Sequence, residues 1–214
     1  MKQWALALLV ATSGTMLAGC AGPPRVSLGE PKVQPDSKDY EKQLKRWTRH
    51  GQLMNDFDQA LQLDATLRSP EFRAAYAAKY IAMYKVTPES QPKVRGDLLS
   101  DGADSYEFHV ESATHDYVLN DLTGTKSVWR VTLVDDQAHE VTPTEISTVR
   151  ERRRLETEFY PYADIFSRGW RIRFPRARAD GTPLVGSDTK SLTLRLAGPQ
   201  GAIDLVWQLL PSAP

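Results

Sequence analysis

The strongest constraint on the fold is a series of short segments with strand character that begins near residue 104. Each runs for roughly five to ten residues, is rich in β-branched and aromatic side chains, and is separated from the next by turn-forming residues. Gly198, Pro199 and Gly201 form one such turn and predict a hairpin. The predicted strands span 106–113, 127–134, 140–149, 169–174, 191–196 and 202–209.

An earlier strand is predicted at 60–68, where Leu61, Leu63, Ala65 and Leu67 alternate with polar residues. This two-residue period is typical of a strand with one buried face. Together the segments predict an antiparallel, immunoglobulin-like β-sandwich. Because the chain has a single cysteine, no internal disulfide can form. The prediction therefore concerns sandwich architecture, not membership of the immunoglobulin family.

Two helices are predicted before the main run of strands. Over 38–48, Tyr40, Leu44 and Trp47 recur at helical spacing. Over 70–84, Ser69 provides a cap and Pro70 occupies the first helical position. The predicted class is therefore mainly β with helices (α+β), with one or two N-terminal helices packed against the sandwich.

The first nineteen residues have the layout of a signal peptide, with Lys2 followed by an apolar run that is too short for a permanent membrane span. The run ends at Leu17, Ala18, Gly19 and Cys20, which resembles the lipobox of bacterial lipoproteins. The resemblance implies cleavage before Cys20 and lipidation of that cysteine. Two or three acyl chains anchor a protein stably, so the lipid would provide the membrane attachment.

The same resemblance predicts a cell-envelope location. Ala21 stands where an aspartate would favour inner-membrane retention, so an outer-membrane protein facing the periplasm or the cell surface is favoured. Residues 20–36 contain four prolines and few apolar side chains, which predicts a lipidated cysteine followed by a flexible tether. The remaining residues, 37–211, are predicted to form a single globular domain.

The charge balance excludes an extended nucleic-acid surface. Without residues 1–19, which carry only Lys2, 27 − 1 = 26 basic residues face 27 acidic ones. A nucleic-acid binder would carry a clustered excess of Lys and Arg. The predicted partners are therefore the membrane, through the lipid on Cys20, and an envelope protein.

The chain contains no recognisable nucleophile elbow, Walker loop or dinucleotide-binding glycine motif, and no cofactor is predicted. His109, Glu111 and His115 could converge on a zinc-like ion. Their spacing matches no established ligand pattern, so the favoured interpretation is that they are solvent-facing residues at a strand edge. His50 is interpreted as a helix-end residue, and His139 as part of a polar turn.

A basic run at Arg150, Arg152, Arg153 and Arg154 precedes an aromatic segment that includes Tyr160 and Tyr162. The run is interpreted as a solvated, internally paired loop, with binding of an acidic partner as the alternative. The aromatic segment either plugs the end of the sandwich or exposes a binding surface. These six residues are the candidate partner-binding set.

Three functions follow from these features. The first is a non-enzymatic envelope lipoprotein that binds another protein and serves a structural or assembly role. The second is a module that binds cell-wall glycan or another polysaccharide, which requires exposed aromatic rings; we expect core packing instead for the tryptophans in predicted strands and helix. The third is a metal-dependent hydrolase built on His109, Glu111 and His115. The tryptophans concerned are Trp47, Trp129, Trp170 and Trp207.

Overall fold

The structure is a computed structural model that describes residues 23–55, 58–116, 119–123, 127–149 and 153–210. Cys20 and the rest of the lipobox lie outside the described residues, as do Arg150 and Arg152. None of the described helices has the length and apolar composition needed to cross a bilayer.

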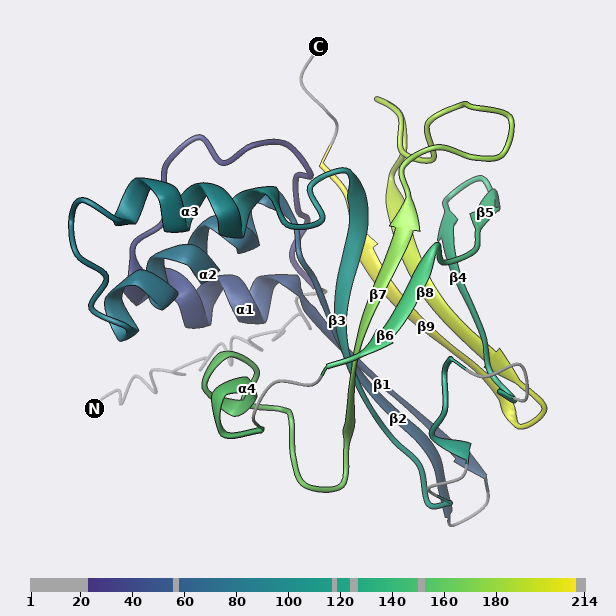
Figure 1. Ribbon diagram of the computed structural model, residues 1–214. Coiled ribbons are helices and arrows are strands. Elements are labelled where there is room, and N and C mark those ends of the chain that lie inside the picture. Colours follow the sequence, from purple (N-terminus) through teal and green to yellow (C-terminus); the bar gives the residue numbers. More distant parts are fainter. Residues whose placement is uncertain (1–22, 56–57, 117–118, 124–126, 150–152, 211–214) are drawn as a thin grey trace, which may run out of the picture.

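Two antiparallel sheets pack face to face (Figure 1). The five-stranded sheet has the order β1-β2-β3-β7-β6 and the four-stranded sheet the order β5-β4-β8-β9. This arrangement confirms the predicted α+β class and the antiparallel sandwich. The strands are β1 (Thr48–Asn55), β2 (Asp58–Leu67), β3 (Ser105–Ala113), β4 (Arg130–Asp135), β5 (Glu140–Val141), β6 (Glu145–Thr148), β7 (Arg168–Pro175), β8 (Ser191–Gly198) and β9 (Gly201–Gln208).

The core lies between the sheets and is built from the alternating apolar positions of the strands. Phe108 on β3 packs against Trp207 on β9, with ring centroids 5.3 Å apart. The Trp207 indole also donates a 2.8 Å hydrogen bond to the carbonyl of Trp47. Large rings of this kind contribute much of the burial that holds two sheets together.

The helices lie on the side of the five-stranded sheet that faces away from the four-stranded sheet (Figure 1). They are α1 (Tyr40–Trp47), α2 (Pro70–Met83), α3 (Gln91–Ser100) and α4 (Arg153–Phe159). The predicted cap of α2 is confirmed, since the Ser69 hydroxyl accepts a hydrogen bond from the N–H of Phe72 at 3.1 Å. The helix predicted over 38–48 corresponds to a 3₁₀ turn, Ser37–Asp39, followed by α1.

The segment predicted as one strand over 140–149 is two strands in different sheets. β5 pairs with β4, whereas β6 pairs with β7. Pro143 stands between them, and proline cannot donate a ladder hydrogen bond. The chain therefore leaves one sheet at this point and crosses to the other.

His50 is not at a helix end, as expected, but within β1, where its Nδ1 lies 3.0 Å from Asp64 Oδ1. Gly51 follows it, and a Cβ there would stand 2.6 Å from Ile203. The glycine that suggested a helix end thus permits the close approach of β9. The sequence also did not predict α3, which buries no residue and so lacks an apolar stripe.

The expectation of a flexible tether over 20–36 is wrong for part of that segment. Val26 is fully buried and bridges Leu209 in parallel register. Its N–H donates to Gln208 O and its carbonyl accepts from Leu210 N–H, each at 2.8 Å. Asp36 forms a capping box with Asp39. The described part of the segment is therefore attached to the edge of β9 and to the first helical turn.

Candidate functional site

A row of ionisable side chains lies on the outer face of β3, beneath the helices. Glu107, His109 and Glu111 alternate with Phe108 and Val110, which face the sandwich core. The three polar residues are nevertheless 0%, 5% and 1% exposed, respectively. The expectation that His109 and Glu111 face solvent is therefore wrong, because the helices and the chain after α4 cover this face. We call these three residues the polar row.

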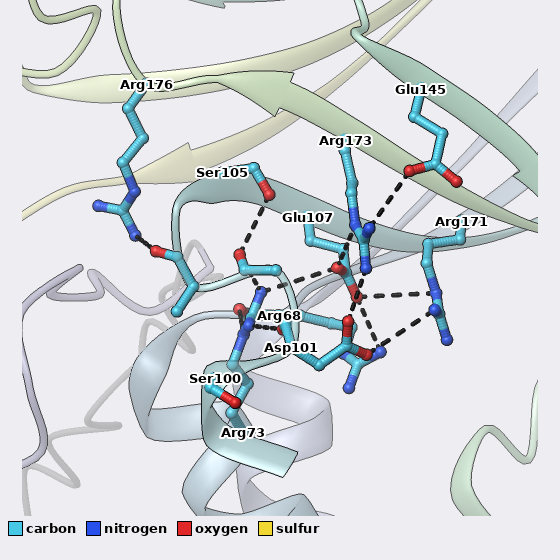
Figure 2. Close-up of polar contacts among 12 residues, drawn as sticks. Arg68, Arg73, Ser100, Asp101, Ser105, Glu107, Glu145, Arg171, Arg173 and Arg176 are labelled. Atoms are coloured by element: carbon cyan, nitrogen blue, oxygen red, sulfur yellow. Dashed lines mark hydrogen bonds and ion pairs between the residues drawn. The ribbon is translucent and has the colours of Figure 1, made fainter. Parts of the chain in front are cut away.

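One end of the polar row is surrounded by arginines (Figure 2). Glu107 Oε1 lies 2.8 Å from Arg68 Nη1, and Glu107 Oε2 lies 2.8 Å from Arg173 Nε. Arg73 of α2 and Arg171 of β7 approach the same carboxylate to 3.9 and 3.8 Å. We refer to these four arginines as the arginine cage. A single buried carboxylate thereby joins β3, β7, α2 and the residue that directly follows β2.

Asp101, just after α3, completes this network. Its Oδ1 lies 2.7 Å from Arg173 Nη2, and its Oδ2 lies 3.7 Å from Arg171 Nη1. Burial lowers the pKa of the Arg73 guanidinium to about 10, which still leaves it charged at neutral pH. Burial would also lower the pKa of Arg68, but the electrostatic influence of Tyr160 and Glu107 holds that pKa above its usual value. The cage is therefore a set of fixed cations.

The other end of the polar row brings together a histidine and two glutamates. His109 Nε2 lies 3.2 Å from Glu111 Oε1 and 3.7 Å from Glu156 Oε1 of α4. Gly169 makes this possible, since a Cβ there would stand 2.4 Å from Glu156 Oε1 and 2.7 Å from Glu111 Oε1. A larger residue at position 169 would displace both carboxylates.

One donor atom from each of His109, Glu111 and Glu156 lies within 4.8 Å of the others. Imidazole nitrogen and carboxylate oxygen are ligands that zinc accepts, so within the described part of the chain these three residues could hold a divalent cation. His115 is exposed and does not belong to this group. The predicted set of His109, Glu111 and His115 is therefore corrected by exchanging His115 for Glu156.

The aromatic segment after α4 packs against the polar row. The ring of Tyr160 stacks on that of His109, with centroids 3.5 Å apart and planes inclined by 5°. The Tyr162 hydroxyl lies 2.6 Å from Thr66 Oγ1, and burial raises the pKa of Tyr162 well above its usual value. Tyr160 is buried and Tyr162 is only partly exposed. The expectation that Tyr160 and Tyr162 contact a partner is therefore corrected: both side chains pack inside the protein, against His109 and Thr66.

The next residues of the same loop carry exposed apolar side chains. Ile165 and Phe166 are 77% and 74% exposed, respectively. The backbone beneath them is fixed, because Asp164 Oδ1 accepts hydrogen bonds from the N–H groups of Phe166 and Ser167 at 2.7 Å each. Ser167 Oγ in turn donates to the buried Glu111. The polar row thus holds the loop that presents Ile165 and Phe166; we call these two residues the apolar tip.

The remaining candidates have simpler environments. All four tryptophans of the described chain are buried, which confirms their expected place in the core and excludes these four rings as platforms for sugar stacking. His139 lies in a turn, 2.9 Å from Asp135 Oδ2. Arg153 and Arg154 begin α4. The four tryptophans are Trp47, Trp129, Trp170 and Trp207.

Sequence reasoning did not identify Glu107 or Glu156 as site residues, and it placed Ile165 and Phe166 in the aromatic segment without choosing between burial and exposure. For Glu107 a signal was present, since three ionisable residues alternate along one predicted strand. For Glu156 no local signal existed, because its partners lie more than forty residues away in the sequence. The exposure of Ile165 and Phe166 depends on the turn made by Asp164, which a pattern of apolar residues does not reveal.

None of the family models searched matches the sequence, and a search of curated proteins found no match. Among solved structures, a novel protein of unknown function from Burkholderia pseudomallei K96243 is similar, with 12% identity over 79% of this chain and 80% of that one, and a TM-score of 0.38. A DUF4426 family protein from Pseudomonas aeruginosa PAO1 has 9% identity over 76% of this chain and 100% of that one, with a TM-score of 0.30. Neither likeness is close enough to indicate a function.

Proposed function

We propose that this chain is a non-enzymatic lipoprotein of the cell envelope that binds another envelope protein through the apolar tip. The observation that carries the proposal is the exposure of Ile165 and Phe166 on a loop whose backbone is fixed by Asp164 and Ser167. The lipobox ending at Cys20 supplies the location, with the outer membrane favoured. The bound protein would serve assembly or a surface complex.

Rigidity is what distinguishes the apolar tip from an ordinary exposed loop. A phenylalanine that fills a partner's pocket is a typical centre of binding energy. Ordering a mobile loop costs free energy on association, and a loop already held by hydrogen bonds avoids much of that cost. The stacking of Tyr160 on His109 extends this support into the sheet.

The basic run that precedes the apolar tip in the sequence indicates the partner's chemistry. Arg153 and Arg154 begin the helix that leads into the loop, and the sequence places Arg150 and Arg152 just before it. A surface that combines an apolar pocket with acidic residues around it would complement both features. This is the acidic-partner alternative for the basic run, now joined to an apolar contact.

The test is photo-crosslinking in cells that produce the protein. A benzophenone amino acid is placed at Phe166 in the full-length protein, and at Val33 as a control, since Val33 is 81% exposed on a different segment. We expect one envelope protein to be captured from position 166 and not from position 33. Binding of that protein in purified form should then be lost in Ile165→Ser, with the thermal unfolding of the domain unchanged.

A Cys20→Ala version separates the anchor from the contact. If lipidation only supplies location, purified Cys20→Ala protein should bind the captured partner as well as the lipidated protein does. Equal capture from positions 166 and 33, or unchanged binding by Ile165→Ser, would contradict a contact at the apolar tip. Failure of Cys20 to incorporate labelled lipid would contradict the anchor.

A further inference from the structure

A cavity of about 220 Å³ lies beside the arginine cage, where the N-terminal segment crosses the beginning of α2 and of β3. Its walls are of two kinds. One is apolar and includes Leu28, Leu67, Leu99 and Tyr106; the other is ionic and includes Arg68, Arg73 and Arg176. Pockets for drug-sized ligands measure roughly 300–1,000 Å³, so this cavity is suited to a smaller molecule.

The charge on the ionic wall favours an anion. Three arginines line the cavity against two carboxylates, Glu30 and Glu107. Glu107 forms ion pairs with Arg68 and Arg173 at 2.8 Å each, so the excess positive charge on this wall comes from Arg73 and Arg176. Glu30 is exposed at the N-terminal side of the cavity.

A further observation agrees with a positive wall. Ser69 and Pro70 line the cavity, which places the positive end of the α2 helix dipole there. The guanidinium of Arg68 is paired with Glu107, at 2.8 Å between Nη1 and Oε1, so Arg68 is not counted as a free donor for a ligand.

Arg176 stands at the edge of the cavity with donors to spare. Among the described residues, one of its five N–H donors is used, through Nη2, on the carbonyl of Ala103 at 2.8 Å. Its guanidinium lies 5.2 Å from the centre of the Tyr106 ring. A planar guanidinium held in this way is suited to paired hydrogen bonds with a carboxylate. The apolar wall lies beside it.

We propose that this cavity binds a small organic anion, a carboxylate with a short apolar chain. The carboxylate is held by Arg176, and the chain packs against Leu28, Leu99 and Tyr106. The site is separate from the apolar tip, so the proposal stands or falls independently of the proposed function.

Hexanoate is the probe, added to the ¹⁵N-labelled full-length protein in neutral detergent and followed by amide chemical shifts. We expect saturable shifts centred on Ala103, Tyr106 and Leu28. Hexanol and hexylammonium, which share the chain but not the negative charge, should bind more weakly than hexanoate by about tenfold or more, since a charged hydrogen bond contributes about 1.5–3 kcal/mol.

Three variants test the site. Arg176→Gln should weaken hexanoate by about tenfold for the same reason. Glu30→Gln should strengthen it by about twofold, because it removes an exposed like charge. Arg178→Gln, the matched control, changes an arginine that bonds Thr182 and does not line the cavity, and should leave hexanoate binding unchanged.

The result that would overturn the proposal is the absence of saturable shifts in these amides. Equal affinity for hexanol and hexanoate would overturn the assignment of an anion. Glu30 is exposed, so Glu30→Gln should fold normally. A failure of Glu30→Gln to strengthen binding would therefore count against this location even if Arg176→Gln proved unstable.

Discussion

Replacing Glu107 by glutamine should destabilise the protein far more than any other single loss of a carboxylate at the arginine cage. Glutamine keeps the shape of the side chain and removes its charge. Glu107 is fully buried and has two arginine nitrogens at 2.8 Å and two more within 3.9 Å. Removing one partner of a buried ion pair typically costs about 3–5 kcal/mol, because the remaining charge is left without compensation.

Glu145 provides the matched control. It contacts Arg173 as well, with Glu145 Oε2 3.2 Å from Nη1, but its side chain is 47% exposed. Exposed pairs contribute about 0–1 kcal/mol, so Glu145→Gln should lower the free energy of unfolding by no more than that. The two variants thus remove the same chemical group from the same arginine at two depths.

The assay is equilibrium unfolding of the purified protein in urea. With a urea dependence of about 2 kcal/mol per molar, Glu107→Gln should lower the midpoint by roughly 1.5–2.5 M and Glu145→Gln by at most about 0.5 M. Equal midpoints for the two variants would refute the reasoning. That result would mean that burial of Glu107 adds nothing to its interaction with the cage.

Three other predictions concern the edges of the fold. Burial would raise the pKa of Asp135, but hydrogen bonds from His139 and Gln137 lower it overall; the stability it contributes should be complete above its unfolded-state pKa and lost as the pH falls through the folded-state value. His139→Gln should reduce this acid sensitivity in urea midpoints measured from neutral to strongly acidic pH. Ser69→Ala should cost about 1 kcal/mol in thermal unfolding, whereas Ser90→Ala should cost little, because Ser90 makes no capping hydrogen bond to α3. Val26→Ala should cost about 1–3 kcal/mol and speed proteolysis of the N-terminal segment; unchanged proteolysis would contradict its attachment to β9.

The agreement between sequence and structure is best where the signal is local. Ser69 before Pro70 marked the start of α2 to the residue, and the alternation around Leu61 to Leu67 marked β2. The sequence led to a wrong interpretation where the role of a residue depends on neighbours distant in the chain. Gly51 resembled a helix end because the approach of Ile203 from β9, which explains the glycine, comes from more than 150 positions later.

The polar row shows most clearly how far a sequence pattern can predict the surroundings of a side chain. The alternation of Glu107, His109 and Glu111 with apolar residues predicts a strand with one polar face, and that strand exists. The pattern does not say what covers the polar face. Because helices cover it here, His109 and Glu111, which were interpreted as solvated, are buried, with His109 3.2 Å from Glu111 and 3.7 Å from Glu156.

The sequence by itself determined the helices and strands whose apolar residues repeat regularly, and the α+β sandwich class. It also led to the prediction of a lipid anchor at Cys20. These depend on the order of neighbouring residues, which the chain carries directly. Only the tertiary structure decided which strands share a sheet, that the outer face of β3 is buried, and that Ile165 and Phe166 are exposed. Those properties arise from contacts between residues distant in the chain, and burial of a charge is stable only where such contacts supply its partner.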